Sequence, residues 1–132
     1  MGALGRQLVV EFWGCRGNLD SAELIRQTLE EAVQKAKAFL LDIKVHKFQP
    51  HGISGVAVIA ESHVSIHTWP EHGYAAVDVF TCGNTDPEAA VEHIRQALKP
   101  RRVKVIKIER GILQGEQMNL ERLERQYTDY DT

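Results

Sequence analysis

The stretch ESHVSIHTW, residues 61–69, is dense in side chains that could do chemistry. Ser62 directly follows a glutamate. After it come His63, His67 and Trp69, which are four and two positions apart from one another. Because successive side chains of a strand point to opposite faces, these three are predicted to share one face. A hydroxyl and two imidazoles this close in sequence allow metal binding, nucleophilic catalysis or self-modification of the chain.

A metal site is the first interpretation, with His63, His67, His72 and Cys82 as its ligands. Two residues four apart on one strand lie roughly 13 Å from each other, too far to share an ion. The chain also has no HxH or CxxC spacing of the kind that zinc sites use. We therefore expect no metal, although ligands assembled across several strands remain an alternative.

A Cys–His hydrolase is the second interpretation, because Cys82 and His67 are predicted to lie on the same unusual face and such pairs activate a thiolate. The sequence supplies neither an orienting third group nor an oxyanion loop for it.

Self-cleavage at Ser62 is the third interpretation. The hydroxyl of Ser62 would attack the carbonyl of Glu61, an N-to-O acyl shift would give an ester, and β-elimination would split the chain between these residues. The former serine would remain as an N-terminal pyruvoyl group, an electron sink like a pyridoxal cofactor. Such a reaction needs a donor and a base, for which His67 and Ser54 are candidates.

The composition narrows the class of protein. The chain has 132 residues, 43% apolar and 26% charged, which is typical of one soluble globular domain. A net charge of −2 argues against a nucleic-acid-binding surface. No apolar run reaches the roughly 20 residues that span a bilayer. The N-terminal residues form no signal-like apolar segment, so Cys15 and Cys82 are predicted to be free thiols in the cytoplasm.

The hydrophobic patterns predict alternating strands and helices. Strands are expected in 5–15, 39–50, 54–69 with a break near its middle, 74–83 and 102–110. One helix is predicted to open with a capping box at Asp20 and Glu23, and the other at Asp86 followed by Pro87. The apolar stripes of the two helices are Ile25, Leu29, Ala32, Val33 and Ala36, and Val91, Ile94, Ala97 and Leu98.

This order of elements predicts an α+β fold. It is a two-layer α/β sandwich in which a mainly antiparallel sheet carries two helices on one face, with a βαββ-type internal duplication. Residues 1–111 form the domain and 112–132 a peripheral tail. Leu120, Leu123 and Tyr127 are at helical spacing, so the tail is expected to be a short helix or a loose end.

One face of the predicted sheet is too aromatic and too titratable for an ordinary solvated surface. Alternation places on it the following residues: Asp42, Lys44, His46, Phe48, His63, Ser65, His67, Trp69, Tyr74, Asp78, Phe80 and Cys82. Such a face is typical of a binding site or an oligomer interface. Because the two helices cover the other side, a partner subunit is the expected lid.

The stretch FQPHGISGVAVIAESHVSIHTWPEHGYAAVDVFTCG, residues 48–83, resembles the core of the prokaryotic pyruvoyl-dependent S-adenosylmethionine decarboxylases. The resemblance extends from LGRQLVVEFWGC (4–15) to KIERG (107–111). It implies a proenzyme that cleaves itself into a β chain, 1–61, and an α chain, 62–132. It also implies a homodimer with its sites at the interface.

The resemblance further implies a role for each matching residue. Ser62 becomes the pyruvoyl group, Ser54 and His67 assist the cleavage, and Cys82 returns a proton to the product carbon. Phe48 and Trp69 are expected around the adenine and the sulfonium, and Glu71 at the ribose hydroxyls. The substrate amine would form a Schiff base with the pyruvoyl ketone, lose CO2 and give decarboxylated S-adenosylmethionine for spermidine synthesis.

Two alternatives stay open. Relatives of this chemistry decarboxylate arginine or ornithine, and Asp78 or Glu11 could serve as the carboxylate that a guanidinium needs. A non-processing ligand-binding module is the alternative outside catalysis, although it would have no need of Ser62, His67 and Cys82.

Overall fold

The computed structural model describes residues 2–112 and 126–131, the latter as backbone alone. The elements of this part of the chain are β1 (Ala3–Trp13), α1 (Ala22–Lys35), β2 (Phe39–Lys47), β3 (Ile53–Ala60), β4 (Ser62–Trp69), a 3-10 turn η1 (Pro70–His72), β5 (Tyr74–Cys82), α2 (Pro87–Leu98), β6 (Arg102–Ile112) and β7 (Gln126–Asp131).

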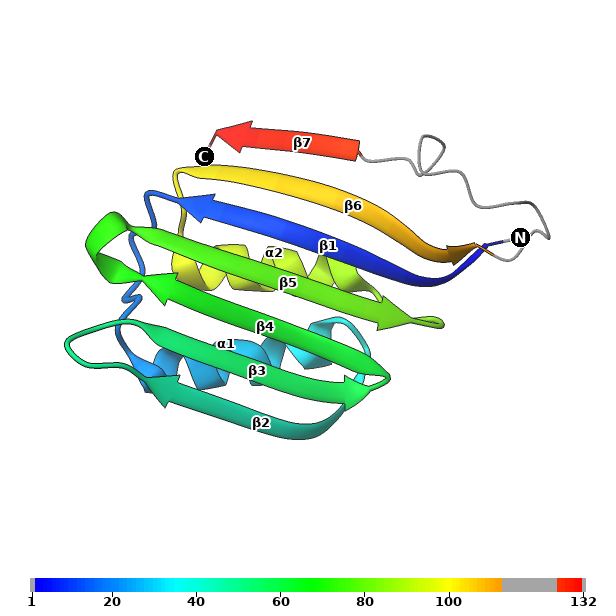
Figure 1. Ribbon diagram of the computed structural model, residues 1–132, viewed down its shortest axis with the longest axis horizontal. Helices are drawn as coiled ribbons and strands as arrows, with labels where there is room; N and C mark the ends of the chain where they lie inside the picture. Colours follow the sequence, from blue (N-terminus) through cyan, green and yellow to red (C-terminus); the bar gives the residue numbers. More distant parts are fainter. Residues whose placement is uncertain (1, 113–125, 132) are drawn as a thin grey trace.

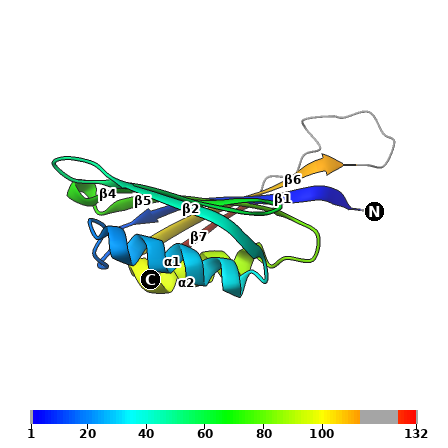
Figure 2. The same cartoon turned by 90° about the horizontal axis from the view of Figure 1, so that it is seen from below.

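The strands form one antiparallel sheet in the order β2-β3-β4-β5-β1-β6-β7 (Figure 1). Both helices lie against the same face of this sheet, and no helix of the described residues lies on the other face (Figure 2). The predicted two-layer α+β sandwich is therefore confirmed.

The core lies between the sheet and the two helices. It is built from alternate residues of the strands, such as Leu8, Val10 and Phe12 of β1, and from the predicted stripe of α1. Val91, Ile94 and Leu98 of the predicted α2 stripe pack there too, whereas Ala97 is only half-buried and Ala90 is buried instead. The core thus uses every second residue of the strands and one stripe of each helix. The remaining strand residues point to the second face of the sheet and are not needed for the core.

The predicted start of the first helix is wrong by one residue. Ser21 is its N-cap, and the Ser21 hydroxyl accepts a hydrogen bond from the Leu24 backbone N–H at 3.0 Å. The Asp20 carboxylate instead accepts a hydrogen bond from the Gly52 N–H at 2.8 Å and pairs with Lys47 Nζ at 2.7 Å. The second helix begins as predicted, because the Asp86 side chain accepts from the backbone N–H of Ala89.

The predicted C-terminal helix is wrong where the structure describes it. Residues Gln126–Asp131 form strand β7, which pairs with β6 and extends the sheet by one strand. Leu120 and Leu123 lie outside the described residues.

Candidate active site

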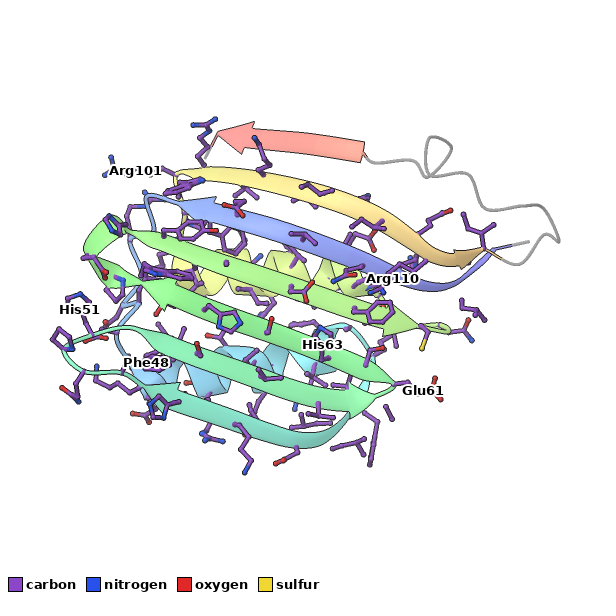
Figure 3. The ribbon with its side chains drawn as sticks, in the orientation of Figure 1. Phe48, His51, Glu61, His63, Arg101 and Arg110 are labelled. Carbon is purple, nitrogen blue, oxygen red and sulfur yellow. The ribbon has the colours of Figure 1, made fainter. Side chains whose placement is uncertain are left out.

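The break predicted within residues 54–69 occurs at Glu61, between β3 and β4. Figure 3 shows Glu61 at one end of the sheet, where the chain turns back. The next residue, Ser62, has a φ of 122°, a conformation that residues with a side chain rarely adopt. Backbone strain of this kind is characteristic of functional sites. The bond that the self-cleavage hypothesis would break thus leads into a strained residue.

Cys82 contacts this junction from the end of β5. Its Sγ lies 3.2 Å from Oε1 of Glu61 and 3.6 Å from the Glu61 backbone oxygen. The hydrogen bond to the Glu61 carboxylate raises the pKa of the Cys82 thiol, and desolvation and the negative charge of Glu61 act in the same direction, while a hydrogen bond from Ser62 opposes them. Cys82 is therefore held as a protonated thiol rather than a thiolate nucleophile.

An open hollow of about 610 Å³ adjoins the same junction. Its walls include Glu61 and Cys82, together with Lys37 from the turn after α1 and Asn84 and Thr85 from the loop after β5. The thiol and the strained junction are therefore reachable from solvent.

Ser54 and His67 form a separate pair. They occupy directly opposed positions on β3 and β4, and Ser54 Oγ lies 2.7 Å from His67 Nδ1. His67 comes five positions after Ser62 on β4, which corresponds to roughly 17 Å along an extended strand. Within one chain the structure brings Ser62, Glu61 and Cys82 together but places the Ser54–His67 pair elsewhere.

The positions of Cys82 and His67 argue against a Cys–His hydrolase. His67 is opposite Ala76 on β5, and Cys82 comes six positions after Ala76 on that strand. Within one chain the two side chains cannot form the nucleophile and base pair that this chemistry needs. Among the described residues, no group of three or more His, Cys, Asp or Glu side chains could hold a metal ion.

The expected substrate-binding residues lie at the end of the sheet opposite Glu61. Figure 3 places Phe48 and His51 there. The rings of Trp69 and Tyr74 have centroids 5.3 Å apart, and Tyr74 lies 4.2 Å from Trp13 on its other side. Glu71 Oε1 lies 3.0 Å from His51 Nε2.

Sequence reasoning missed the support of Trp69 by Tyr74. Tyr74 donates a hydrogen bond to Glu11 Oε1 at 2.7 Å, and desolvation, followed by this bond, raises the pKa of the phenol. The only signal was Tyr74 on the predicted aromatic face, because the pairing of β1 with β5 that brings it beside Trp13 leaves no local signal. The array of Trp13, Tyr74 and Trp69 offers aromatic faces that suit a purine or a cation.

A polar network crosses the middle of the open sheet face. Asp78 accepts a hydrogen bond from Gln7 at one oxygen, at 2.8 Å, and contacts His63 Nε2 at the other, at 2.9 Å. Arg110 donates to Gln7 and lies over the ring of Phe80. The face predicted to carry titratable and aromatic groups therefore has them, and they are largely bonded to one another.

Comparison with known proteins identifies the family. Residues 6–111 match the family model described as S-adenosylmethionine decarboxylase. The chain belongs to this family. It is 51% identical over 113 residues to the S-adenosylmethionine decarboxylase proenzyme of Thermotoga maritima, which covers 84% of this chain and 87% of that protein. It is 48% identical over 115 residues to the proenzyme of Thermomicrobium roseum, covering 86% and 98%.

Solved structures agree with this family membership. The crystal structure of the adenosylmethionine decarboxylase from Aquifex aeolicus is 41% identical, covers 90% of this chain and all of that one, and superposes with a TM-score of 0.80. The Trypanosoma brucei AdoMetDC-delta26 monomer, 22% identical with a TM-score of 0.61, shares the fold over 45% of its length. No helix among the described residues has the length and apolar character to cross a membrane.

Proposed function

We propose that this chain is an S-adenosylmethionine decarboxylase that generates its own pyruvoyl group by cleavage between Glu61 and Ser62. The observation that carries the proposal is the junction itself, where a strained serine follows Glu61 and a protonated Cys82 lies against it. The relatives at about half identity are named as proenzymes of this activity, which fits a chain that must be processed.

The cleavage uses only atoms of the chain and one water. Ser62 Oγ bonds to the Glu61 carbonyl carbon, the C–N bond breaks, and the nitrogen takes up the proton that the hydroxyl lost. β-Elimination then breaks the ester. It releases the first chain with the main-chain carboxylate of Glu61 at its C-terminus and leaves a dehydroalanine at position 62. Hydrolysis of that residue releases ammonia and leaves a pyruvoyl group at the start of the second chain.

The residues around Ser62 fit a pyruvoyl group. The pyruvoyl group is small and uncharged, and Cys82 is the hydrogen-bond donor beside the position that it would occupy. When formed, the group supplies an electron-withdrawing ketone that stabilises the negative charge left by departing CO2. Cys82 holds a proton next to that position, and the Glu61 carboxylate keeps the proton on the sulfur. Cys82 is thus the acid that protonates the product carbon.

A homodimer completes the site. In one chain the open face carries two separate groups of site residues. The first group, at one end, is Ser62, Glu61 and Cys82. The second group, toward the other end, is Ser54, His67, Phe48, Trp69 and Glu71. Two copies related by a twofold axis, with their open faces in contact, would place the second group of one copy over the first group of its partner. The separation of roughly 17 Å along β4 is the reason that a second copy is needed.

The substrate then binds between the two chains. Trp69 and Phe48 stack on the adenine and attract the sulfonium. Glu71 binds the ribose hydroxyls, and its Oε1 also contacts His51.

The arginine and ornithine alternatives are disfavoured by the carboxylates. Both oxygens of Asp78 are already engaged, by Gln7 and His63. Glu11 accepts the hydrogen bond of Tyr74. Both candidate carboxylates already bind groups of the protein, whereas the aromatic array suits a nucleoside.

A decarboxylation assay tests the proposal. Purified protein is given carboxyl-labelled S-adenosylmethionine, arginine or ornithine, and released CO2 is counted, with Ser62→Ala as the control that cannot form the group. We expect release from S-adenosylmethionine alone and none from the variant. Release from arginine or ornithine, or equal release by the variant, would overturn the assignment.

A further inference from the structure

Asp20 lies just before α1 but does not cap it, because Ser21 is the N-cap. Its carboxylate instead contacts both ends of the loop of residues 48–52, which joins β2 to β3. One oxygen accepts a hydrogen bond from the Gly52 N–H at 2.8 Å, and the other lies 2.7 Å from Nζ of Lys47, the last residue of β2. The same Nζ also donates to the backbone oxygen of Asp20 at 2.8 Å. Asp20 therefore clamps the 48–52 loop from outside.

The segment that carries Asp20 is itself fixed. The Asp20 N–H donates to Asn18 Oδ1 at 3.0 Å. The preceding carbonyl, that of Leu19, accepts a hydrogen bond from the buried Thr68 hydroxyl at 2.8 Å, which ties the segment to β4. The hydrogen bond from Lys47 is the largest of the effects that lower the pKa of the Asp20 carboxyl, so this group is charged at neutral pH. A charged acceptor in a fixed position can hold the loop in one place.

The 48–52 loop carries residues of the expected nucleoside site. Phe48 is expected at the adenine, and His51 Nε2 lies 3.0 Å from Oε1 of Glu71, which is expected at the ribose. Figure 3 shows Phe48 and His51 at the same end of the sheet. The loop closes with a hydrogen bond from the Phe48 N–H to the Gly52 oxygen at 2.8 Å, and Gly52 has a φ of 109°. Glycine has more backbone freedom than any other residue, so contacts from outside the loop help to keep one shape.

We propose that Asp20 is a positioning residue for the nucleoside part of the substrate. By holding both ends of the 48–52 loop, it determines where the Phe48 ring and His51 lie when adenine and ribose bind. The inference rests on the proposed function and deepens it, because it assigns substrate affinity to a residue outside the site. Asp20 holds the loop rather than the reacting groups, so its loss should weaken substrate binding more than it slows the chemical step.

Substitution of Asp20 separates binding from chemistry. Asp20→Ala removes both side-chain contacts and should raise KM for S-adenosylmethionine about 10-fold with little change in kcat, because a displaced loop misplaces groups that bind the substrate. Asp20→Asn keeps an oxygen that can accept the Gly52 N–H and should raise KM less. Rates are expressed per processed chain, quantified on denaturing gels, so that only cleaved protein is compared.

A nucleoside without the amino acid shows which part of the substrate is affected. Methylthioadenosine has the adenine and the ribose but lacks the amine that would form the Schiff base, and it should compete with the substrate. In Asp20→Ala its inhibition constant should rise by the same factor as KM. An unchanged inhibition constant would show that Asp20 does not position the nucleoside.

Ser21→Ala is the matched control, because Ser21 is the neighbouring residue and caps α1. It should lower the midpoint of thermal unfolding and leave KM unchanged. A wild-type KM in Asp20→Ala, or an equal rise of KM in Ser21→Ala, would overturn the role of Asp20. A wild-type protein that releases no CO2 from S-adenosylmethionine would instead overturn the proposed function, and this inference with it.

Discussion

Ser54 Oγ and His67 Nδ1 lie 2.7 Å apart on opposed positions of β3 and β4. The pair can transfer a proton, but in the same chain Ser62 lies five positions before His67, at the start of β4. This arrangement leads to a test in which the two groups are supplied by different chains.

Mixed dimers should restore a cleavage that neither variant performs alone. Ser62→Ala lacks the nucleophile, and His67→Ala lacks the base, whose loss should slow cleavage by about 10²- to 10⁴-fold. When the two variants are co-expressed, the His67→Ala chain should be cleaved because its partner supplies His67. Intact masses identify which chain is cut. A wild-type chain that is cleaved while the mixed dimer is not would rule out a site shared between chains.

Loss of the Cys82 thiol should separate processing from turnover. Cys82→Ala should still be cleaved, since Ser62 is the nucleophile, while kcat for decarboxylation should fall by about 10²- to 10⁴-fold. Cys15→Ala is the control, because Cys15 is a partly buried thiol against the Phe12 carbonyl at 3.7 Å and away from the junction. Equal activity of Cys82→Ala and Cys15→Ala would remove Cys82 from the mechanism.

The Glu61 carboxylate should control the ionisation of Cys82. Its hydrogen bond and charge raise the pKa of the thiol, so Glu61→Gln should lower that pKa and increase the thiolate fraction at pH 7 to 9. In the uncleavable Ser62→Ala background, alkylation of Cys82 by iodoacetamide should therefore become faster at each pH. Cys15, whose pKa burial raises to about 11, should stay unreactive in both chains. Identical rate profiles for Cys82 would show that Glu61 does not hold its proton.

Tyr74 should act on substrate binding through Trp69. Aromatic contacts of this kind are worth about 0.5–1.5 kcal/mol, so Tyr74→Leu should raise KM for S-adenosylmethionine roughly 2- to 10-fold with little change in kcat. Tyr74→Phe keeps the ring contacts at 4.2 and 5.3 Å and should change KM less. Two variants with the same loss, or a loss confined to kcat, would contradict a positioning role for the ring.

The fold was predictable because local patterns and tertiary packing agree. The stripe of α1 and the cap at Asp86 needed only spacing and residue type. The start of α1 was missed because Asp20 and Ser21 are both good caps, and the contacts of Asp20 with Gly52 and Lys47 decided between them. Strand β7 was missed because pairing with β6 determines it, and pairing leaves no local signal.

The candidate site was predictable in its residues and not in its geometry. Alternation placed Cys82, His67 and Trp69 on one face, but only the register shows that Cys82 and His67 lie far apart along the strands.

The most direct test of self-cleavage is the intact mass of the purified protein under denaturing conditions. We expect two chains, residues 1–61 and 62–132, with the second lighter by one ammonia than a chain that begins with serine. A single chain of 132 residues, or a cut that leaves an ordinary serine at position 62, would contradict the self-generated pyruvoyl group.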